Sequence, residues 1–276
     1  TVQIDFGPTT QEFLVGPGSA SVPGVPAGLW ALHERYGTVP MPVLAAPAIA
    51  AAVEGIPVTA GFERVVELLW PIVSRSEALR SLFAPNGTRL REGDTFVFPA
   101  LADTLDEFAS SGSRYFRDGP GTQAFLETLH GKSRITALDF QSQRVIFRPA
   151  LAATYRDATL WVPGPPSAAG VGVAHTLATL ERFGEAADPT GVATVQRLRD
   201  ALTTAVTMRG RPFLTDMFTE GFGPAFLERV NAYRTGAAPG AGYTTHISTV
   251  DGAGNAVAIT HSLGETAGMV AGSSGV

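Results

Sequence analysis

The sequence predicts a mixed α/β protein, because two kinds of periodicity occur along it. Short runs rich in β-branched residues are typical of strands. Longer stretches repeat apolar residues every three or four positions, as amphipathic helices do. Clusters of glycine and proline separate the two kinds of stretch. The chain has 276 residues, 45% of them hydrophobic, which is ordinary globular composition for one large domain or two small ones.

A glycine- and proline-rich loop separates the first strand from the first helix. Thr1–Phe6 alternates apolar and polar residues and predicts a strand. The loop Gly16–Gly28 lacks the Gly-Lys-Ser/Thr ending of a phosphate-binding loop. Leu29–Tyr36 has helical spacing and predicts a short helix, in which His33 is expected to have a packing or surface role.

Helices dominate the middle of the chain. They are expected over Pro42–Val53, Phe62–Val73, Phe98–Phe108 and Thr122–His130. Gly55 should end the first of them, and Pro47 should kink it or delay its start. Pro71 should bend or end the second.

A pair of strands and a capped helix come next. Arg144–Pro149 and Ala158–Pro163 predict the strands. The tight loop of residues 164–170 opens a helix that should run to about Phe183. Ser167 lies at the N-terminus of this helix, where free backbone amides could bind an anion. An N-cap is the simpler interpretation, and we favour it.

Two more helices precede the last part of the chain. They are expected over Val192–Met208 and Pro224–Tyr233. The apolar residues of the longer one share a face and are Val195, Leu198, Leu202 and Val206. Residues 236–242 contain too few large apolar side chains to pack and predict a flexible loop.

The chain from residue 244 to residue 264 predicts a β-hairpin. Thr245–Val250 and Ala256–Leu263 are rich in β-branched residues, and the turn-forming residues 251–255 lie between them. If the ends of that loop pair with each other, Thr244 lies opposite Ser262.

Alternation along the two strands gives the hairpin two different faces. One face is small and rich in hydroxyl groups, and its residues are Thr244, His246, Ser248, Ala258, Thr260 and Ser262. The other is mainly apolar, and its residues are Thr245, Ile247, Thr249, Val257, Ile259, His261 and Leu263. We expect the apolar face to pack in a core and His246 to have a structural role.

The position of Thr244 suits an N-terminal nucleophile. A threonine hydroxyl is a weak nucleophile until a base takes its proton. An N-terminal threonine can use its own α-amino group, whose ordinary pKa is about 7.7–8.0. That amine is free only if the bond from Tyr243 to Thr244 is cut, and a flexible loop before Thr244 would expose this bond. On the pattern alone we favour the simpler interpretation, that two threonines begin a strand, because both are strand formers.

A resemblance to a known family favours the nucleophile. The residues Thr244–Leu263, TTHISTVDGAGNAVAITHSL, resemble the processing-site segment of the γ-glutamyltransferase (γ-glutamyltranspeptidase) family. Members of that family are made as one precursor that cleaves itself before the first threonine of this motif. The resemblance therefore implies cleavage between Tyr243 and Thr244, with Thr244 as the nucleophile. Ser262 stands where the family usually has a threonine that assists it.

The same resemblance extends over most of the chain. Its strongest segments are Val22–Gly37, Phe98–Ala102, Arg148–Gly170 and Thr244–Leu263, and they occur in the family's order. It implies a partial αββα sandwich of the N-terminal-nucleophile hydrolases and no cofactor or metal. It also implies a large-subunit-like region over residues 1–243, incomplete at its N-terminus. Residues 244–276 would begin a small-subunit-like region whose remainder is the partner.

The implied reaction is hydrolysis or acyl transfer on γ-glutamyl amides such as glutathione. Two departures from the family pattern bear on it. Gly7 and Pro8 stand where the family has Arg-Glu, and that arginine would hold the α-carboxylate of a γ-glutamyl substrate. Gly264 replaces an asparagine. The alternatives are an acylase for another acyl group, like the cephalosporin acylases, and a non-catalytic member that acts as a binding module.

Composition excludes several other functions. The net charge is −5 without a basic cluster, which argues against nucleic acid as a partner. No cysteine is present, so disulfides and thiolate chemistry are excluded. The most apolar run, Met41–Val58, contains prolines and a glutamate and does not read as a membrane span. Because the chain starts without methionine and ends without a cap or charged tail, we expect an internal piece of a longer chain. Family members are often exported, so the resemblance allows a periplasmic or secreted location without fixing one.

Overall fold

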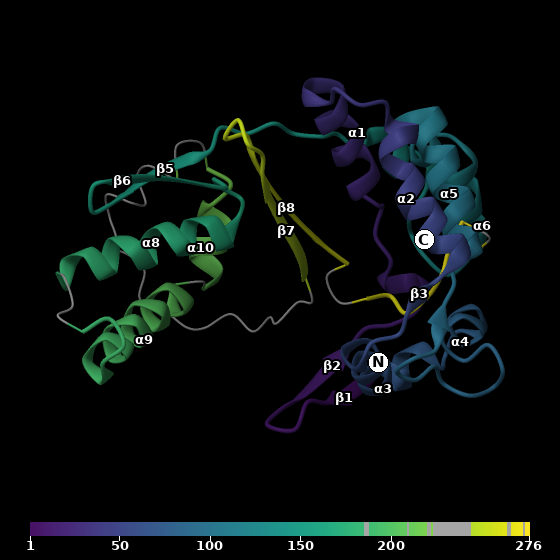
Figure 1. The fold of residues 1–276 in the computed structure, drawn as a ribbon, viewed down its shortest axis with the longest axis horizontal. Helices are drawn as coiled ribbons and strands as arrows, with labels where there is room; N and C mark the ends of the chain where they lie inside the picture. Colours follow the sequence, from purple (N-terminus) through teal and green to yellow (C-terminus); the bar gives the residue numbers. More distant parts are fainter. Residues whose placement is uncertain (185–187, 209, 220–221, 223–243, 264–265, 273) are drawn as a thin grey trace. The chain divides into compact units, whose positions relative to one another are not determined.

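The structure is a computed structural model, and it describes all residues except 185–187, 209, 220–221, 223–243, 264–265 and 273. The described residues divide into two compact units. The first contains Thr1–Val145 and Gly242–Val276, and the second contains Ile146–Ala241. Helices and short strands occur in both (Figure 1), so the predicted mixed α/β class is confirmed. Each sheet among the described residues has two strands.

The first strand pairs with its neighbour and packs on a helix. β1 (Val2–Asp5) runs antiparallel to β2 (Thr10–Phe13), with Val2 opposite Phe13. Alternation puts Val2, Ile4 and Phe13 on the buried face, where they pack with Ile72. The strand predicted at the start of the chain is therefore confirmed.

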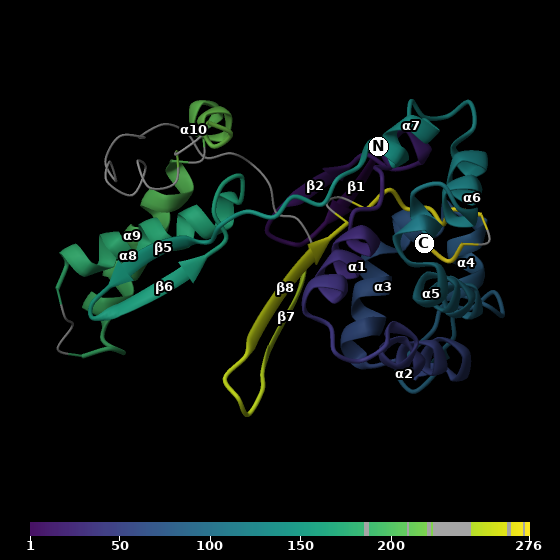
Figure 2. The ribbon, with the colours of Figure 1, turned by 90° about the horizontal axis from the view of Figure 1, so that it is seen from above.

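The helical part of the first unit contains the four middle helices that the sequence predicts. Its helical segments are η1 (Pro17–Ser19), α1 (Val25–Tyr36), α2 (Met41–Glu54), α3 (Ala60–Val73), α4 (Glu77–Phe83), α5 (Pro99–Ser111), η2 (Gly112–Phe116), α6 (Pro120–Leu129) and α7 (Ala137–Ser142). The short strands β3 (Ile56–Pro57) and β4 (Thr95–Phe96) pair antiparallel. α2 and α5 lie side by side in both ribbon views (Figures 1 and 2).

Proline affects these helices less than the sequence suggests. α1 begins at Val25, before the expected start, because Pro26 is tolerated in a first helical turn. α2 begins at Met41 and continues past Pro47, and α3 continues past Pro71 to Val73. Gly55, at φ 91°, follows the end of α2 as expected.

The last residues of the chain pack into the core of the first unit. Ala271 is fully buried beside Phe125, Leu129 and Phe140. Ser274 is also buried, and its carbonyl accepts a hydrogen bond from the Thr104 hydroxyl. The described residues of the segment after the hairpin, 266–272 and 274–276, thus contribute to the core built by residues before them.

Glycine is required where this segment approaches helix α5. Gly275 has a φ of +66°, and a Cβ at this position would lie 2.5 Å from the Leu101 backbone nitrogen. A side chain would therefore clash with the α5 backbone. At the other end of the segment, the Gly16 N–H donates to the Ala267 carbonyl at 2.7 Å. Both ends are held by residues far upstream in the sequence.

The second unit is a small hairpin packed on helices. It contains β5 (Leu151–Tyr155), β6 (Ala158–Val162), α8 (Ala168–Arg182), α9 (Val192–Thr207) and α10 (Arg211–Asp216). Its core is an apolar cluster whose described members are Leu151, Ala153, Val162, Val171, Ala174, Ala205, Met208, Phe213, Met217 and Phe222. The predicted helix after residue 164 and the long helix that begins at Val192 are both confirmed. The helix expected over Pro224–Tyr233 lies outside the described residues.

The strand predicted over Arg144–Pro149 is wrong. The strand that pairs with β6 begins at Leu151, and Tyr155 lies opposite Ala158. The cause is the tight turn between the strands, in which Arg156 adopts a left-handed φ of 54° and donates its N–H to Glu181 Oε1 at 2.9 Å. This turn fixes the pairing to residues 151–155, and the apolar run before Pro149 stays outside the sheet.

The apolar face of α9 is not its buried face. Its predicted members Val195, Leu198, Leu202 and Val206 are 43–59% exposed. Ala201 and Ala205 are buried instead, on a helix that packs against α8. Small residues allow close approach of two helices, which the apolar pattern alone does not indicate.

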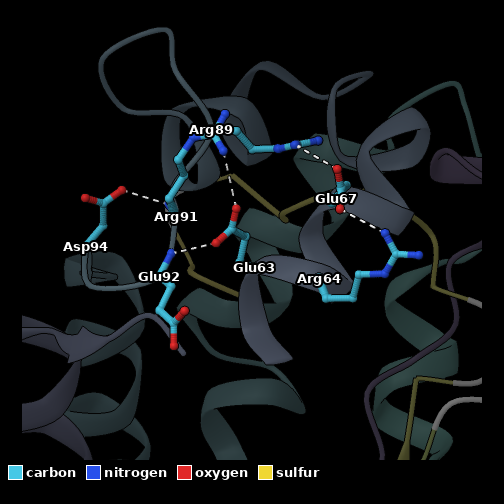
Figure 3. Close-up of polar contacts among 7 residues, drawn as sticks. All are labelled: Glu63, Arg64, Glu67, Arg89, Arg91, Glu92 and Asp94. Atoms are coloured by element: carbon cyan, nitrogen blue, oxygen red, sulfur yellow. Dashed lines mark hydrogen bonds and ion pairs between the residues drawn. The ribbon is translucent and has the colours of Figure 1, made fainter. Parts of the chain in front are cut away.

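A polar cluster holds the turn of residues 89–94 against helix α3. Its residues, drawn in Figure 3, are Glu63, Arg64, Glu67, Arg89, Arg91, Glu92 and Asp94. Glu67 accepts from Arg64 at 2.9 Å and from Arg89 at 3.4 Å (Figure 3). The Glu63 carboxylate accepts from the Glu92 backbone N–H at 2.8 Å. The hydrogen bond from Arg64, followed by the charge of Arg89, lowers the pKa of the Glu67 carboxyl.

We expect the Phe13→Ala variant to lower the free energy of unfolding by about 3–5 kcal/mol, because Phe13 is fully buried in the β1–β2 core. Leu14→Ala is the matched control, since Leu14 is 58% exposed and should change stability by less than about 0.5 kcal/mol. Urea unfolding followed by tryptophan fluorescence measures both. Equal losses in the two variants would contradict this packing.

We expect the Glu67→Gln variant to be less stable than the wild-type chain at neutral pH. The folded pKa of Glu67 lies below its usual value of 4.5, so the carboxylate stabilises the fold above pH 4.5 and loses this effect as the pH falls. The melting temperatures of the two proteins should therefore converge in acid. Glu12→Gln, an exposed change without an ion pair in the described structure, should show no such dependence. A constant difference from neutral to acidic pH would contradict the role of Glu67.

Candidate active site

The candidate site lies at the open end of the last hairpin. β7 (Thr244–Val250) and β8 (Ala256–Ser262) pair antiparallel, as Figure 1 shows in yellow. Thr244 lies opposite Ser262, and His246 lies opposite Thr260. The predicted register is confirmed. The two residues predicted to act in catalysis are thus direct cross-strand partners on one face of the hairpin.

The turn at the other end of the hairpin fixes this register. The Asp251 carboxylate accepts from the backbone N–H groups of Ala253 at 2.9 Å and Asn255 at 2.8 Å. It also accepts from the Asn255 side-chain amide at 2.8 Å. The Asn255 side chain is the largest cause of the lowered pKa of Asp251. With Gly254 at φ 84°, the turn closes in one conformation, and a slip of one residue would turn every side chain to the opposite face.

His246 links the two strands on the hydroxyl-rich face. Its Nδ1 lies 2.6 Å from the Thr260 hydroxyl, and its Nε2 lies 2.8 Å from the Ser248 hydroxyl. A neutral imidazole offers one donor and one acceptor, and a hydroxyl can satisfy either. The contacts agree with the structural role expected for His246. His246 and Thr260 are also the next pair on the face that carries Thr244 and Ser262, two positions along the strands.

The apolar face of the hairpin is exposed, contrary to expectation. Ile247 is 54% exposed, Val257 44% and Leu263 82%. A two-stranded sheet covers neither of its own faces, so burial requires another layer of structure. The expectation that this face packs in a core is therefore wrong for the described part of the chain.

The two predicted catalytic residues lie at the ends of their strands. Thr244 is the first residue of β7 and is exposed. Ser262 is the last residue of β8 and is also exposed. Both side chains are therefore accessible at one end of the hairpin. Tyr243, the loop of residues 236–242 and Gly264 lie outside the described residues.

Gly7, which stands where the family pattern has an arginine, lies in a tight turn. Gly7 has a φ of 89°, and its N–H donates to Asp5 Oδ1 at 2.8 Å. An arginine at this position would need a left-handed conformation that L side chains rarely adopt. This part of the chain therefore offers no guanidinium at residue 7 for a substrate carboxylate.

Two other candidate residues, Ser167 and His33, have structural roles, and one further histidine lies in the interior. The Ser167 hydroxyl accepts from the Gly170 N–H at 3.3 Å, so Ser167 is an N-cap of α8, the simpler of its two interpretations. His33 Nε2 lies 2.7 Å from the Val39 carbonyl, which fits the surface role expected for it. His175, also in α8, is fully buried and belongs to the interior of the second unit.

Sequence reasoning missed the contribution of residues 266–276. These residues come after the nucleophile motif and anchor the hairpin's C-terminal end in the first unit. The available signal was a series of small residues, Gly268, Ala271, Ser274 and Gly275, which are the residue types that fit between packed helices.

Among the described residues, no group of three or more His, Cys, Asp or Glu side chains could hold a metal ion. In the same part of the chain, no helix is both long and apolar enough to cross a membrane.

Comparison with known proteins gives a consistent result. The family model described as Gamma-glutamyltranspeptidase matches residues 4–276. The glutathione hydrolase proenzyme of Escherichia coli is 26% identical over 294 residues, which cover 98% of this chain and 50% of that protein. The chain thus spans about half the length of the curated relatives it matches.

Two solved structures share the fold. The cephalosporin acylase from Bacillus halodurans superposes with a TM-score of 0.74 at 23% identity, covering 96% of this chain and 53% of that one. The gamma-glutamyltranspeptidase of Helicobacter pylori superposes with a TM-score of 0.66 at 21% identity, covering 86% of this chain and 71% of that one. At these identities the likeness concerns the fold.

Proposed function

Because the chain belongs to the gamma-glutamyltranspeptidase family and has the α/β fold of its N-terminal-nucleophile hydrolases, we propose that it is part of a self-processing amidohydrolase or acyltransferase. Thr244 is its nucleophile, and γ-glutamyl amides such as glutathione are its substrates. The observation that carries this proposal is the direct pairing of Thr244 with Ser262 on the hydroxyl-rich face of the hairpin.

The proposed reaction begins with self-cleavage. In the uncut chain the nitrogen of Thr244 belongs to a peptide bond and is not a base. Cleavage of the bond from Tyr243 to Thr244 converts this nitrogen into an amine whose ordinary pKa is about 7.7–8.0. The amine and the hydroxyl then belong to one residue, so the base is always close to the nucleophile.

Substrate turnover then takes two steps. The Thr244 hydroxyl oxygen attacks the carbonyl carbon of the substrate amide, and the α-amine takes the hydroxyl proton. The amine returns this proton to the leaving nitrogen as the amide bond breaks, which leaves an acyl ester on Thr244. Water or an acceptor amine then attacks the ester and releases the acyl group. Ser262, on the opposite strand, supports the Thr244 hydroxyl or amine by a hydrogen bond.

The two products of cleavage would stay together. We propose that residues 1–243 belong to a large subunit and that residues 244–276 begin a small subunit, whose remainder is the partner of this chain. The support is the packing of residues 266–276 among Phe125, Leu129 and Phe140. These contacts join residues before the proposed cut to residues after it, so they would remain when the bond is cut.

The test of the proposed function is the intact mass of the full-length gene product, for the wild type and for Thr244→Ala. The wild type should give two fragments, the second with Thr244 at its N-terminus, and the variant should stay uncut and inactive. Thr245→Ala is the matched control, because Thr245 is the next residue but lies on the other face of the strand. It should still be cut. A wild type that stays uncut would favour a non-catalytic binding module.

A second candidate function is an acylase for an acyl group without an α-carboxylate. Gly7, with its left-handed φ, favours it, because this residue replaces the arginine that would hold that carboxylate. A bidentate contact between arginine and a carboxylate is among the strongest hydrogen-bonded contacts in proteins. Its loss should weaken the selection of γ-glutamyl groups over neutral ones.

A matched pair of substrates separates the two candidates. The cleaved enzyme would be given γ-glutamyl p-nitroanilide and butyryl p-nitroanilide, which differ in the α-amino and α-carboxylate groups. For the acylase, the two kcat/KM values should lie within about tenfold of each other, or about 1.4 kcal/mol. A preference of more than about a thousandfold for the γ-glutamyl compound would exclude the acylase and show that another residue holds the carboxylate.

A further inference from the structure

A cleft in the first unit is lined by residues outside the hairpin. It is about 680 Å³ in volume and lies between residues 18–22, at the end of η1, and residues 131–135, before α7. Both segments belong to the first unit. The cleft is broadly open to solvent, and its volume falls within the range of about 300–1,000 Å³ that small-molecule sites occupy.

The rim of the cleft is cationic. Lys132 and Arg134 both line it and are exposed. Within the described part of the chain, neither side chain forms an ion pair or a hydrogen bond. Lys132 is also the only lysine among 20 basic residues.

One carboxylate, that of Asp139, also lines the cleft, but it is already engaged. Asp139 Oδ2 accepts from the Thr136 N–H at 2.7 Å and from the Thr136 hydroxyl at 2.8 Å. The bond from the Thr136 N–H belongs to the capping box of α7. Among its described residues, the cleft therefore has two cations without partners and one carboxylate committed to a helix cap, which leaves a net positive charge.

Three half-buried apolar residues contribute to the lining of the cleft and are called its floor here. Ala20, Val22 and Ile135 line it and pack against the cluster of Phe125, Leu129, Phe140 and Ala271. The backbones are close here, since a Cβ on Gly18 would lie 3.5 Å from the Lys132 carbonyl oxygen. A ligand with a charged head and a small apolar body would match this combination of rim and floor.

We propose that this cleft binds a small organic phosphate monoester, whose phosphate is held by Lys132 and Arg134 and whose apolar group rests on Val22 and Ile135. A phosphate monoester carries a charge of about −1.5 to −2 near neutral pH, which matches two cations better than the single charge of a carboxylate does. Lysine supplies a mobile point charge and arginine a planar fork, and both suit phosphate oxygens.

The experiment is isothermal titration calorimetry at low ionic strength, with phenyl phosphate, inorganic phosphate and benzoate as probes. The protein is the Thr244→Ala chain, so that binding is measured apart from any cleavage or turnover. Phenyl phosphate should bind in a saturable way. Its affinity should exceed that of inorganic phosphate because of the apolar floor, and that of benzoate because of the second charge.

Variants identify the site. The double change Lys132→Gln and Arg134→Gln should weaken phenyl phosphate binding by about tenfold or more, because two charge-assisted contacts are lost. Arg80→Gln is the control, since Arg80 is exposed and does not line the cleft, and it should leave binding unchanged. Far-UV circular dichroism would confirm that the variants fold.

Three results would overturn the proposal. The first is that phenyl phosphate does not bind in a saturable way. The second is that phenyl phosphate and inorganic phosphate bind with equal affinity. The third is that the folded double variant binds phenyl phosphate as tightly as the protein without these two changes. Because cleavage at Thr244 plays no part in this assay, its outcome is independent of the proposed enzymatic function.

Discussion

The register of the β7–β8 hairpin is the constraint on which the candidate site depends. Thr244 lies opposite Ser262 because the Asp251 turn pairs Val250 with Ala256 at the other end of the hairpin. The carboxylate of Asp251 satisfies three donors within the loop, so the turn does not rely on contacts with other elements. His246 adds a cross-strand contact next to the pair. The pairing of Thr244 with Ser262, on which the proposed mechanism depends, is thus built locally, from one short stretch of sequence.

The hairpin is anchored in the first unit by the segment on its C-terminal side. Residues 266–276 enter the core of that unit, where Ala271 and Ser274 are buried. A cut before Thr244 would leave this anchor untouched. After the proposed cut, this burial would keep the proposed nucleophile on the folded body, because noncovalent contacts would replace the lost peptide link.

Local patterns in the sequence predicted the hairpin and most helices. Turn chemistry at residues 251–255 and strand alternation were sufficient for the register, because both act over a few residues. The helix end at Gly55 could be predicted by the same kind of local rule. The family resemblance added the proposed role of Thr244, which no pattern of strand formers could distinguish from an ordinary strand start.

Features that depend on distant packing were not predictable. β5 lies after Pro149, where the tight turn at Arg156 sets the pairing, although the residues before Pro149 are better strand formers. On α9, Ala201 and Ala205 are buried, because small side chains allow this helix to approach α8 closely. The hairpin's apolar face is exposed because its burial requires a further layer of structure, which the strand pattern cannot supply.

The most direct test of the central claim is to locate the acyl group on the enzyme during turnover. The cleaved protein would be mixed with an acyl p-nitroanilide, quenched in acid and digested at acidic residues, since residues 244–276 contain no lysine or arginine. Mass spectrometry of the peptide from Thr244 to Asp251 would then find the acyl mass. Fragment ions that place it on Thr244 are the predicted result. An acyl group on any other residue, or turnover without an adduct on this peptide, would contradict the account.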